Sequence, residues 1–396
     1  MSSEKRSIPI MKPCLGEDEA QAARRAILSG WVTQGPEVAA FEQEFRAYVG
    51  ADHACAVSNC TTALHLALVA LGVGRGDEVI TVSHSFIATA NSVRFCGATP
   101  VFADIDPLTF NIDAARVEPL ITERTKAILC VHQIGMPCDI AAVLEIAGRR
   151  GLRVVEDAAC AIGSEIRIDG RWERIGRPHG DIACFSFHPR KTLTTGDGGM
   201  LTTSSTAIDA HLRLLRHQGM SVPDTVRHGA LRVIDESYPI VGYNYRMTDI
   251  QAAVGRVQLA RLPELIARRR EQADRYCELL DSIDGVSAPH EPAYARSSWQ
   301  SYCVRLEDGI DRHLVMQAML DRGVSTRRGI LCAHREPAYP PETWRAAPGP
   351  DALAESERAR DQCVLLPIYH DLAPDEQEYV VETLRTAIHA TARVVG

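Results

Sequence analysis

The sequence predicts an α/β protein with a mostly parallel sheet and a second, smaller α/β domain at its carboxyl end. Through the first half of the chain, short apolar runs of strand length alternate with segments of helical pattern. Such alternation is typical of parallel strands covered by helices on both faces. From residue 206 onward, helical patterns dominate. Because 396 residues exceed the usual length of one domain, we expect a large domain over 1–255 and a small one over 256–396.

The composition favours a cytoplasmic protein and argues against several other classes. The net charge of −8 is unfavourable for a nucleic-acid-binding surface. The N-terminus lacks the apolar core of a signal peptide, and no apolar run is long enough to span a bilayer. The twelve cysteines are scattered, and none stands at a zinc-type spacing. We therefore expect reduced thiols, no bound metal, and no nucleic-acid or membrane partner.

The elements of the large domain follow from apolar periodicity and from glycine and proline positions. A helix has Pro36 in its first turn and ends at Gly50. Strands are then expected over 54–57, 78–82, 100–106, 127–132, 153–156, 182–185 and 200–203. Helices are expected over 63–74, over 86–95 with a start at His84 or Ser85, from Asp113, and over 139–150.

The remaining elements are mostly helical. A helix capped by Thr248 or Asp249 precedes a long charged helix that starts at Pro263 and connects to the small domain. That domain is expected to hold a strand at 302–306, a helix over 311–322 and a last helix from Pro374.

Sheets of this kind bind ligands at the carboxyl ends of their strands. The segments that follow strands are therefore the candidate site: 58–62, 83–86, 132–136, 157–160 and 186–191. The first of them lies between a strand and a helix, where free backbone N–H groups can hold an anion. Capping of that helix by Ser58, Asn59 or Thr61 is the alternative interpretation.

Lys191 lies alone in a turn-rich segment between two strands, after Pro189 and before Gly196, Gly198 and Gly199. Such a segment holds an amine in a fixed position. A Schiff-base lysine needs this, together with a pKa well below the usual ~10.4. The alternative is a solvated lysine in a hairpin loop.

Asp157 directly follows the strand of Val154 and Val155. A buried acid at a strand end must meet a cation, a metal or hydrogen-bond donors. The protonated ring nitrogen of pyridoxal phosphate (PLP) is a suitable partner, because PLP enzymes combine such an aspartate with a Schiff-base lysine. Helix capping by Asp157, or an inward-facing Glu156, are the alternatives.

Four requirements of PLP are met at strand ends. Lys191 supplies the amine and Asp157 the acid for the ring nitrogen. The turn of Cys60 to Thr62, with Ser186, forms a phosphate cup, and Phe86 offers a face for the ring. The combination predicts a PLP site more strongly than any one residue does.

The chain resembles the DegT/StrS type of PLP-dependent sugar aminotransferase, which has the aspartate aminotransferase fold (PLP fold type I). The motifs that carry the resemblance are WVTQGPEVAAFEQEF, TTALHLALVALGVGRGDEVIT, FIATANSVRFCGATPVFADIDPLTFNID, VVEDAACAIGSE, FSFHPRKTLTTGDGG and GYNYRMTDIQAA. They follow the family's order from Gly30 to Leu262.

The resemblance implies a role for each cofactor residue. Lys191 would form the internal aldimine and then act as general base and acid. Asp157 would keep the pyridine nitrogen protonated, and Phe86 would stack on the ring.

The resemblance also implies how the phosphate is bound. The backbone amides of Cys60 and Thr61 and the Ser186 hydroxyl would hold it, and Asn244 would reach it from the other subunit of a homodimer.

Two positions, Cys60 and Cys160, depart from the family pattern. A third, Lys191, matches the aminotransferases of the family and differs from its sugar dehydratases. Cys60 replaces a frequent glycine of the phosphate turn. Cys160 replaces a glutamine or histidine that contacts the ring hydroxyl, and a thiol is a weaker donor. Relatives that dehydrate sugars have a histidine at the position of Lys191, so the lysine favours amino transfer.

The implied reaction moves an amino group from glutamate or glutamine to a keto-sugar, with a nucleotide-linked 4-keto-6-deoxyhexose as the leading candidate. Candidate substrate contacts are His84, His188, Arg246 and His334. The alternatives are an aminotransferase acting on a cyclitol ketone of the scyllo-inosose type, a PLP-dependent sugar dehydratase or epimerase, and a ligand-binding regulatory protein.

Overall fold

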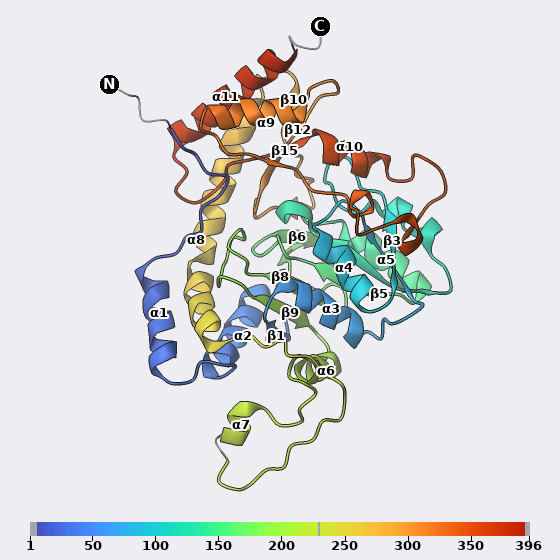
Figure 1. Cartoon of the computed structure of the whole chain (residues 1–396), viewed down its shortest axis with the longest axis vertical. Coiled ribbons are helices and arrows are strands. Elements are labelled where there is room, and N and C mark those ends of the chain that lie inside the picture. Colours follow the sequence, from blue (N-terminus) through green and yellow to red (C-terminus); the bar gives the residue numbers. More distant parts are fainter. Residues whose placement is uncertain (1–5, 229, 393–396) are drawn as a thin grey trace.

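A computed structural model describes residues 6–228 and 230–392 of the chain (Figure 1). Helix α8 (Asp249–Leu280) runs from a large lower part of the molecule to a smaller part at the top and joins the two. The sequence predicts a new helix from Pro263, whereas α8 continues through this proline. Leu259, Leu262 and Ile266 are all buried in the core, and this packing outweighs the one backbone hydrogen bond that a proline removes.

The large sheet has eight strands in the order β1-β9-β8-β5-β4-β2-β3-β14. They are β1 (His53–Val57), β2 (Glu78–Val82), β3 (Thr99–Ala103), β4 (Thr125–Val131), β5 (Arg153–Asp157), β8 (Ile182–Ser186), β9 (Gly199–Thr203) and β14 (Arg345–Ala346). All neighbours from β8 to β14 are parallel, while β9 is antiparallel to β8 and β1. The prediction of a mostly parallel sheet is confirmed.

Helices cover both faces of this sheet, as the sequence predicts. The helices of the large part are α1 (Glu17–Leu28), α2 (Pro36–Val49), α3 (Cys60–Ala70), α4 (Ile87–Phe95), α5 (Ile140–Arg150), α6 (Thr206–Arg216) and α7 (Asp224–His228). Of these, α1 packs against α8 and α7 lies in the connection between α6 and α8, so neither covers the sheet. Side chains of α2, α5 and α8 share one core with alternate strand residues such as Val154 and Phe185. Side chains of α3, α4 and α6 share the opposite core with Val155 and Cys184. Adjacent residues at the end of a strand therefore face different layers.

Two helix predictions need correction. The helix expected from Asp113 is a pair of 3-10 turns, Ala114–Arg116 and Glu118–Leu120, because Pro119 has no N–H to continue a helix. Helix α4 starts at Ile87, and its N-cap is Phe86 rather than His84 or Ser85.

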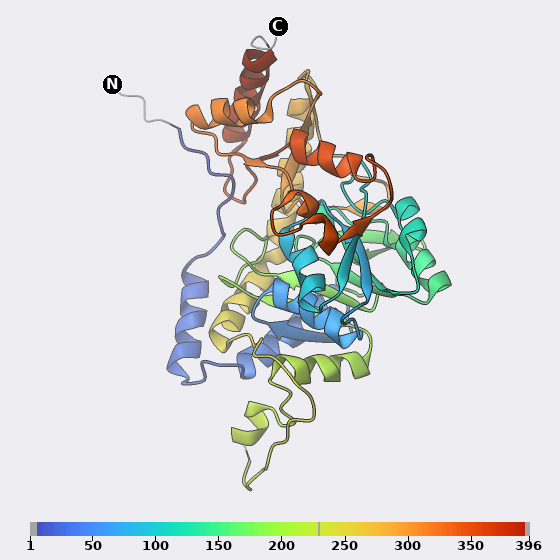
Figure 2. The ribbon, with the colours of Figure 1, turned by 45° about the vertical axis from the view of Figure 1, so that its right-hand side comes forward.

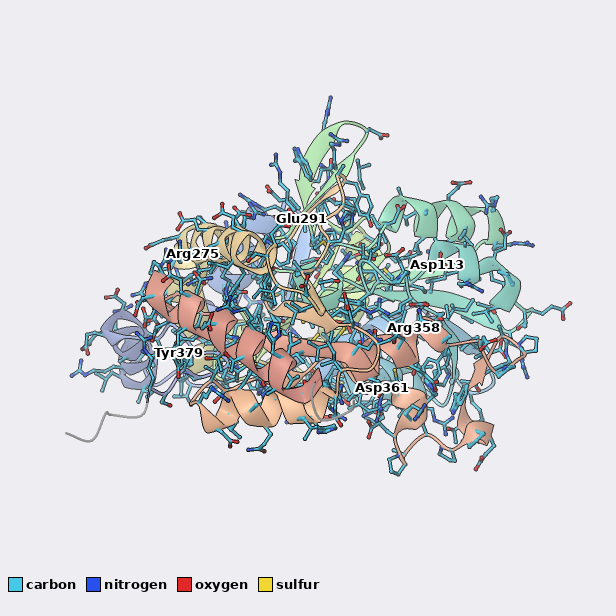
Figure 3. All side chains as sticks on the ribbon, turned by 90° about the horizontal axis from the view of Figure 1, so that it is seen from above. Asp113, Arg275, Glu291, Arg358, Asp361 and Tyr379 are labelled. Carbon is cyan, nitrogen blue, oxygen red and sulfur yellow. The ribbon has the colours of Figure 1, made fainter. Side chains whose placement is uncertain are left out.

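The smaller part is built on an antiparallel sheet in the order β10-β12-β15-β13. Its strands are β10 (Val286–Ser287), β12 (Tyr302–Leu306), β15 (Cys363–Leu366) and β13 (Arg327–Arg328), and its helices are α9 (Arg312–Asp321), α10 (Ala354–Gln362) and α11 (Pro374–Ala392). Seen from above, Arg275 of α8 lies beside α11 (Figure 3), where it pairs with Glu378 at 2.5 Å. The sequence-based domain boundary at 255/256 falls within α8 and stays a prediction.

Further short elements complete the fold. A three-stranded sheet consists of β11 (Ala295–Arg296), β6 (Glu165–Ile168) and β7 (Arg171–Arg174), none of which the sequence analysis predicts. Single 3-10 turns occur at Gln133–Gly135, Ala333–Arg335 and Pro341–Thr343. Within the described ranges, no helix is long and apolar enough to cross a membrane.

A long connection, residues 217–246, joins α6 to α8, and its middle part with α7 projects away from the body at the bottom of the molecule (Figure 2). We call it the strap. Among its described residues it exposes five large apolar side chains: Val226, Leu231, Val233, Tyr238 and Val241. Such a row of exposed apolar groups is unusual for a free surface.

Candidate active site

Lys191 lies in the connection between β8 and β9, and its side chain turns into the protein. Its backbone N–H donates to the His188 carbonyl at 2.8 Å, which closes a tight turn. Farther along, Thr195 N–H donates to the Phe187 carbonyl at 3.0 Å. The Lys191 Nζ lies 3.0 Å from the Cys160 sulfur. The amine is therefore fixed in place, and the alternative of a solvated loop lysine is wrong.

The pKa of Lys191 differs from the sequence-based expectation. Burial works to lower it, but Cys160, Cys60 and Asp157 all face the amine and their combined effect raises the pKa above its ordinary value. The expectation of a depressed pKa is wrong for this arrangement, because the residues predicted to surround the cofactor are themselves acids.

Asp157 ends β5 and is buried, with 4% of its surface exposed. Its carboxylate accepts hydrogen bonds from the Thr89 hydroxyl at 2.8 Å and from the Ala159 N–H at 3.1 Å. Burial raises the pKa of Asp157, and the Thr89 hydrogen bond only partly opposes this. Within the described residues no cation pairs directly with this carboxylate, so a protonated ring nitrogen would supply the missing charge.

Glu156 faces the other layer of the molecule and has partners of its own. His132 Nε2 lies 3.1 Å from its carboxylate, and the N–H groups of His179 and Gly180 each donate at 2.9 Å. Burial opposes ionisation, but hydrogen bonds from His132 and His179 hold the pKa of Glu156 well below its usual range. Of the two acids, Asp157 is the one that lacks a charged partner.

The turn before α3 combines helix capping with free backbone donors. Asn59 is the N-cap, and its side chain accepts from the Thr62 N–H at 2.9 Å. In the described part of the chain, the amides of Cys60 and Thr61 have no hydrogen-bond partner. Capping of the helix by Asn59 is therefore confirmed, and the two amides remain available to an anion at a helix N-terminus.

Gly199 brings this turn to Ser186. It pairs with Val57 on one side and with Ser186 on the other. A Cβ atom at Gly199 would lie 2.5 Å from the Asn59 carbonyl carbon and 2.8 Å from the Cys60 nitrogen. Only glycine allows this approach, which holds the turn before α3 beside Ser186.

These residues fit PLP. Two unpartnered amides and a hydroxyl suit its phosphate, a buried carboxylate without a cation suits its ring nitrogen, and a fixed amine suits its aldehyde. Phe86 stands at the start of α4 with 66% of its surface exposed, so its ring is open to a stacking partner. Thr89 is a residue that the sequence analysis misses, since one threonine in a helix gives no signal.

Two predicted substrate contacts are packed inside the protein. His84 is 1% exposed, neither of its ring nitrogens has a hydrogen-bond partner within the described chain, and burial followed by the charge of Arg305 lowers its pKa to about 3. His334 bridges Ser83 at 2.6 Å and Glu357 at 2.9 Å, so both of its nitrogens are engaged. His188, by contrast, is exposed next to the Lys191 turn.

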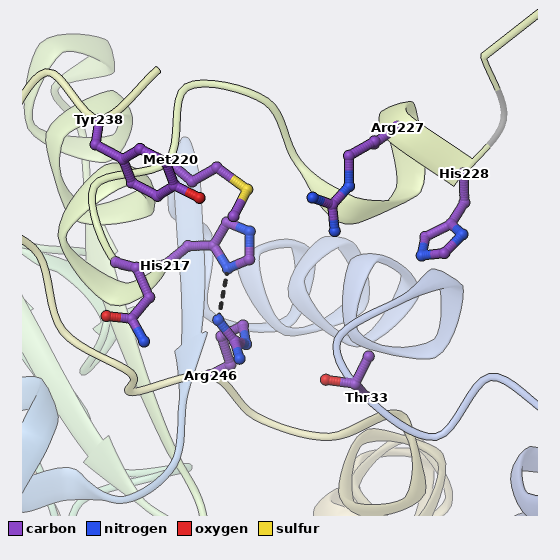
Figure 4. A pocket seen from close by; sticks show the side chains of 8 residues that line it. Thr33, His217, Met220, Arg227, His228, Tyr238 and Arg246 are labelled. Atoms are coloured by element: carbon purple, nitrogen blue, oxygen red, sulfur yellow. Dashed lines mark hydrogen bonds between the residues drawn. The ribbon is translucent and has the colours of Figure 1, made fainter. Parts of the chain in front are cut away.

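Arg246 and Asn244 belong to the strap. Arg246 lines a cavity of about 590 Å³ with Thr33, His217, Gln218, Met220, Arg227, His228 and Tyr238 (Figure 4). Its guanidinium lies 2.9 Å from His217 Nδ1. Neither Lys191 nor Asp157 lines this cavity. Asn244 is exposed.

A lysine between β8 and β9, an aspartate at the end of β5 and the N-terminus of α3 form the arrangement expected of a PLP-dependent enzyme of fold type I. The comparisons with known proteins agree. The model of the DegT/DnrJ/EryC1/StrS aminotransferase family matches residues 13–385. The chain belongs to this family and is a PLP-dependent aminotransferase.

Individual relatives and solved structures match nearly the whole chain. GDP-perosamine synthase from Caulobacter vibrioides is 43% identical over 336 residues, which cover 84% of this chain and 86% of that protein. The aminotransferase TlmJ from Streptoalloteichus hindustanus is 35% identical with a TM-score of 0.87, covering 97% and 100% of the two chains. Spr1654 from Streptococcus pneumoniae, solved in its PLP form, has a TM-score of 0.88 at 26% identity and covers 98% and 100%.

Proposed function

We propose that this enzyme transfers an amino group from glutamate or glutamine to a nucleotide-linked keto-sugar, with a 4-keto-6-deoxyhexose as the leading candidate. The observation that carries the amino transfer is the fixed Lys191 amine opposite the buried Asp157 carboxylate. The similarity to GDP-perosamine synthase supports a nucleotide-linked sugar. The twelve free thiols favour a reducing compartment, so we place the enzyme in the cytoplasm.

PLP, when bound, acts as an electron sink for the carbanion formed at the donor carbon. Asp157 holds the proton on the ring nitrogen that makes this sink effective. The Lys191 amine would remove the proton from the donor Cα and hold it for the return transfer, a task that requires an amine fixed in place. The Cys60 and Thr61 amides and the Ser186 hydroxyl would anchor the phosphate, and Phe86 would cover one ring face.

We further propose that the working unit is a homodimer, in which Asn244 of the strap reaches the phosphate of the partner's cofactor. Asn244 is exposed, and the strap presents Leu231, Val233 and Val241 to the outside. A second copy of the chain would cover these side chains.

The visible absorption spectrum of the purified protein tests the amino transfer. A band of lysine-bound PLP should be present and should bleach when the correct donor, glutamate or glutamine, is added. A Lys191→Ala variant should lack that band. A protein that stays colourless with added PLP would overturn the proposal.

The substrate is tested by turnover. Nitrogen from the bleaching donor should appear in the product when a nucleotide-linked 4-keto-sugar is supplied. Transfer to a cyclitol ketone instead would correct the substrate class and leave the aminotransferase chemistry in place.

A further inference from the structure

Arg190 directly precedes Lys191, and its guanidinium is exposed at the same turn. Its backbone is held on both sides. The Arg190 N–H donates to His188 Nδ1 at 3.2 Å, and its carbonyl accepts from Gln300 Nε2 at 2.8 Å. Gln300 stands just before β12, so this contact joins the lysine turn to the smaller part of the molecule.

Arg327 lies in β13 of the smaller part, whose sheet also contains β12, the strand that follows Gln300. It pairs with Leu365 of β15, and Leu365 pairs with Cys303 of β12. Arg327 therefore lies two strands away from the segment that holds Arg190, and its side chain is exposed. Its neighbour Arg328 has an acid partner, Glu336, at 3.9 Å.

Arg190 and Arg327 lack such partners. Within residues 6–228 and 230–392, no carboxylate pairs with either guanidinium. Partial burial, and after it the charge of Arg327, lower the pKa of Arg190. Burial and then Arg190, with a further effect of Lys191, lower the pKa of His188, and the charge of Asp197 opposes them. The two arginines thus repel each other beside a catalytic lysine, an arrangement that an anion would relieve.

We propose that Arg190 and Arg327 bind the diphosphate of the nucleotide-linked substrate. This inference rests on the proposed function. Guanidinium groups bind phosphate oxygens in bidentate fashion, and two of them match the charge of a diphosphate. The α-carboxylate of the amino donor is the other anion that reaches the site, but its single charge would leave one arginine unpaired.

The test is calorimetric titration of the PLP-loaded enzyme with GDP, UDP and dTDP. At least one of these nucleotides should bind the natural protein. Arg190→Gln and Arg327→Gln should each weaken that binding by about 10-fold or more. Arg322→Gln is the matched control, because Arg322 is an exposed arginine at the end of α9. Among the described residues its guanidinium donates only to the Ala318 carbonyl, at 3.1 Å, and its loss changes net charge equally. It should bind like the natural protein.

Three results would overturn the inference, and they differ from failure of the proposed function. If the natural protein and both variants bind the nucleotide equally and still turn over the nucleotide-linked sugar, the two arginines do not bind the diphosphate. The proposed function would then stand. If the two variants bind the nucleotide normally but their PLP band no longer bleaches with glutamate, the arginines bind the carboxylate of the amino donor instead. No nucleotide binding by the natural protein removes both the nucleotide-linked substrate and the inference, while bleaching by the donor still identifies an aminotransferase.

Discussion

Glu156 and Asp157, neighbours at the end of β5, face opposite layers of the molecule and have opposite electrostatic environments. Glu156 is paired with His132 at 3.1 Å, and its pKa is low. Asp157 receives only neutral donors, and its pKa is raised. Because successive side chains of a strand point to opposite faces, Glu156 has its partners within the protein, whereas Asp157 faces a layer that offers it no cationic partner among the described residues.

Asp157→Asn should abolish most activity. An amide at this position cannot keep the ring nitrogen protonated, so we expect the rate of donor bleaching to fall roughly 100-fold or more. Stopped-flow absorption of the PLP-loaded enzyme measures this rate. Thr89→Ala, which removes one hydrogen bond at 2.8 Å from the same carboxylate, should cost much less. Equal rates for Asp157→Asn and the natural enzyme would contradict the assignment.

Gly199→Ala should weaken cofactor binding. The added methyl group would lie 2.5 Å from the Asn59 carbonyl carbon and would push the phosphate turn away from Ser186. We expect the Kd of PLP to rise about 10-fold or more, measured by fluorescence titration of the cofactor-free protein. Gly148→Ala is the control, because a Cβ there meets nothing within 4 Å. An unchanged Kd of PLP for Gly199→Ala would show that cofactor binding does not depend on the close contact between Gly199 and the turn of Asn59 and Cys60.

The sequence predicts the fold better than it predicts the charges of the site. Strand 78–82 and the helix from Pro36 have the predicted bounds, because apolar periodicity and a terminal proline are local signals. The continuation of α8 through Pro263 depends on packing on both sides of the proline, which the local sequence does not contain.

The environments of the site's side chains also depend on residues that are distant in the sequence. The positions of Lys191 and Asp157 follow from strand ends, but the raised pKa of Lys191 arises from Cys160, Cys60 and Asp157, which are distant in sequence. His84 follows a strand as a ligand contact would, yet tertiary packing buries it.

The His132–Glu156 pair should make stability fall at alkaline pH. Burial works to lower the pKa of His132, but Cys138 and Glu156 outweigh it and raise the pKa to about 10. A raised pKa in the folded state means that the stabilisation is complete below about 6.5 and is lost as pH rises towards 10. The Tm should therefore decline between pH 7 and 10, and His132→Gln should show a smaller decline.

Glu156→Gln tests the same pair from the acid side. Removing one partner leaves a buried charge without compensation, so the free energy of unfolding should drop by about 3–5 kcal/mol. Because the pKa of Glu156 is lowered in the folded state, its contribution is present above about pH 4.5 and is lost on acidification. Urea unfolding at pH 7 and pH 4 should show a larger difference between natural protein and variant at pH 7. The same difference at both values would contradict the ion pair.

Complementation between two inactive variants should reveal whether Asn244 acts across the dimer. Lys191→Ala lacks the amine, and Asn244→Ala should lose most activity because it lacks the proposed phosphate contact from the partner. In a mixed dimer, one site combines the intact lysine of one chain with the intact asparagine of the other. Random mixing makes half of the dimers mixed, so about a quarter of all sites should regain activity. Co-expression with two different affinity tags isolates the mixed dimers, and activity per site measures the gain. If Asn244 serves the site of its own chain, every site in the mixed dimer carries one defect, and mixing restores nothing.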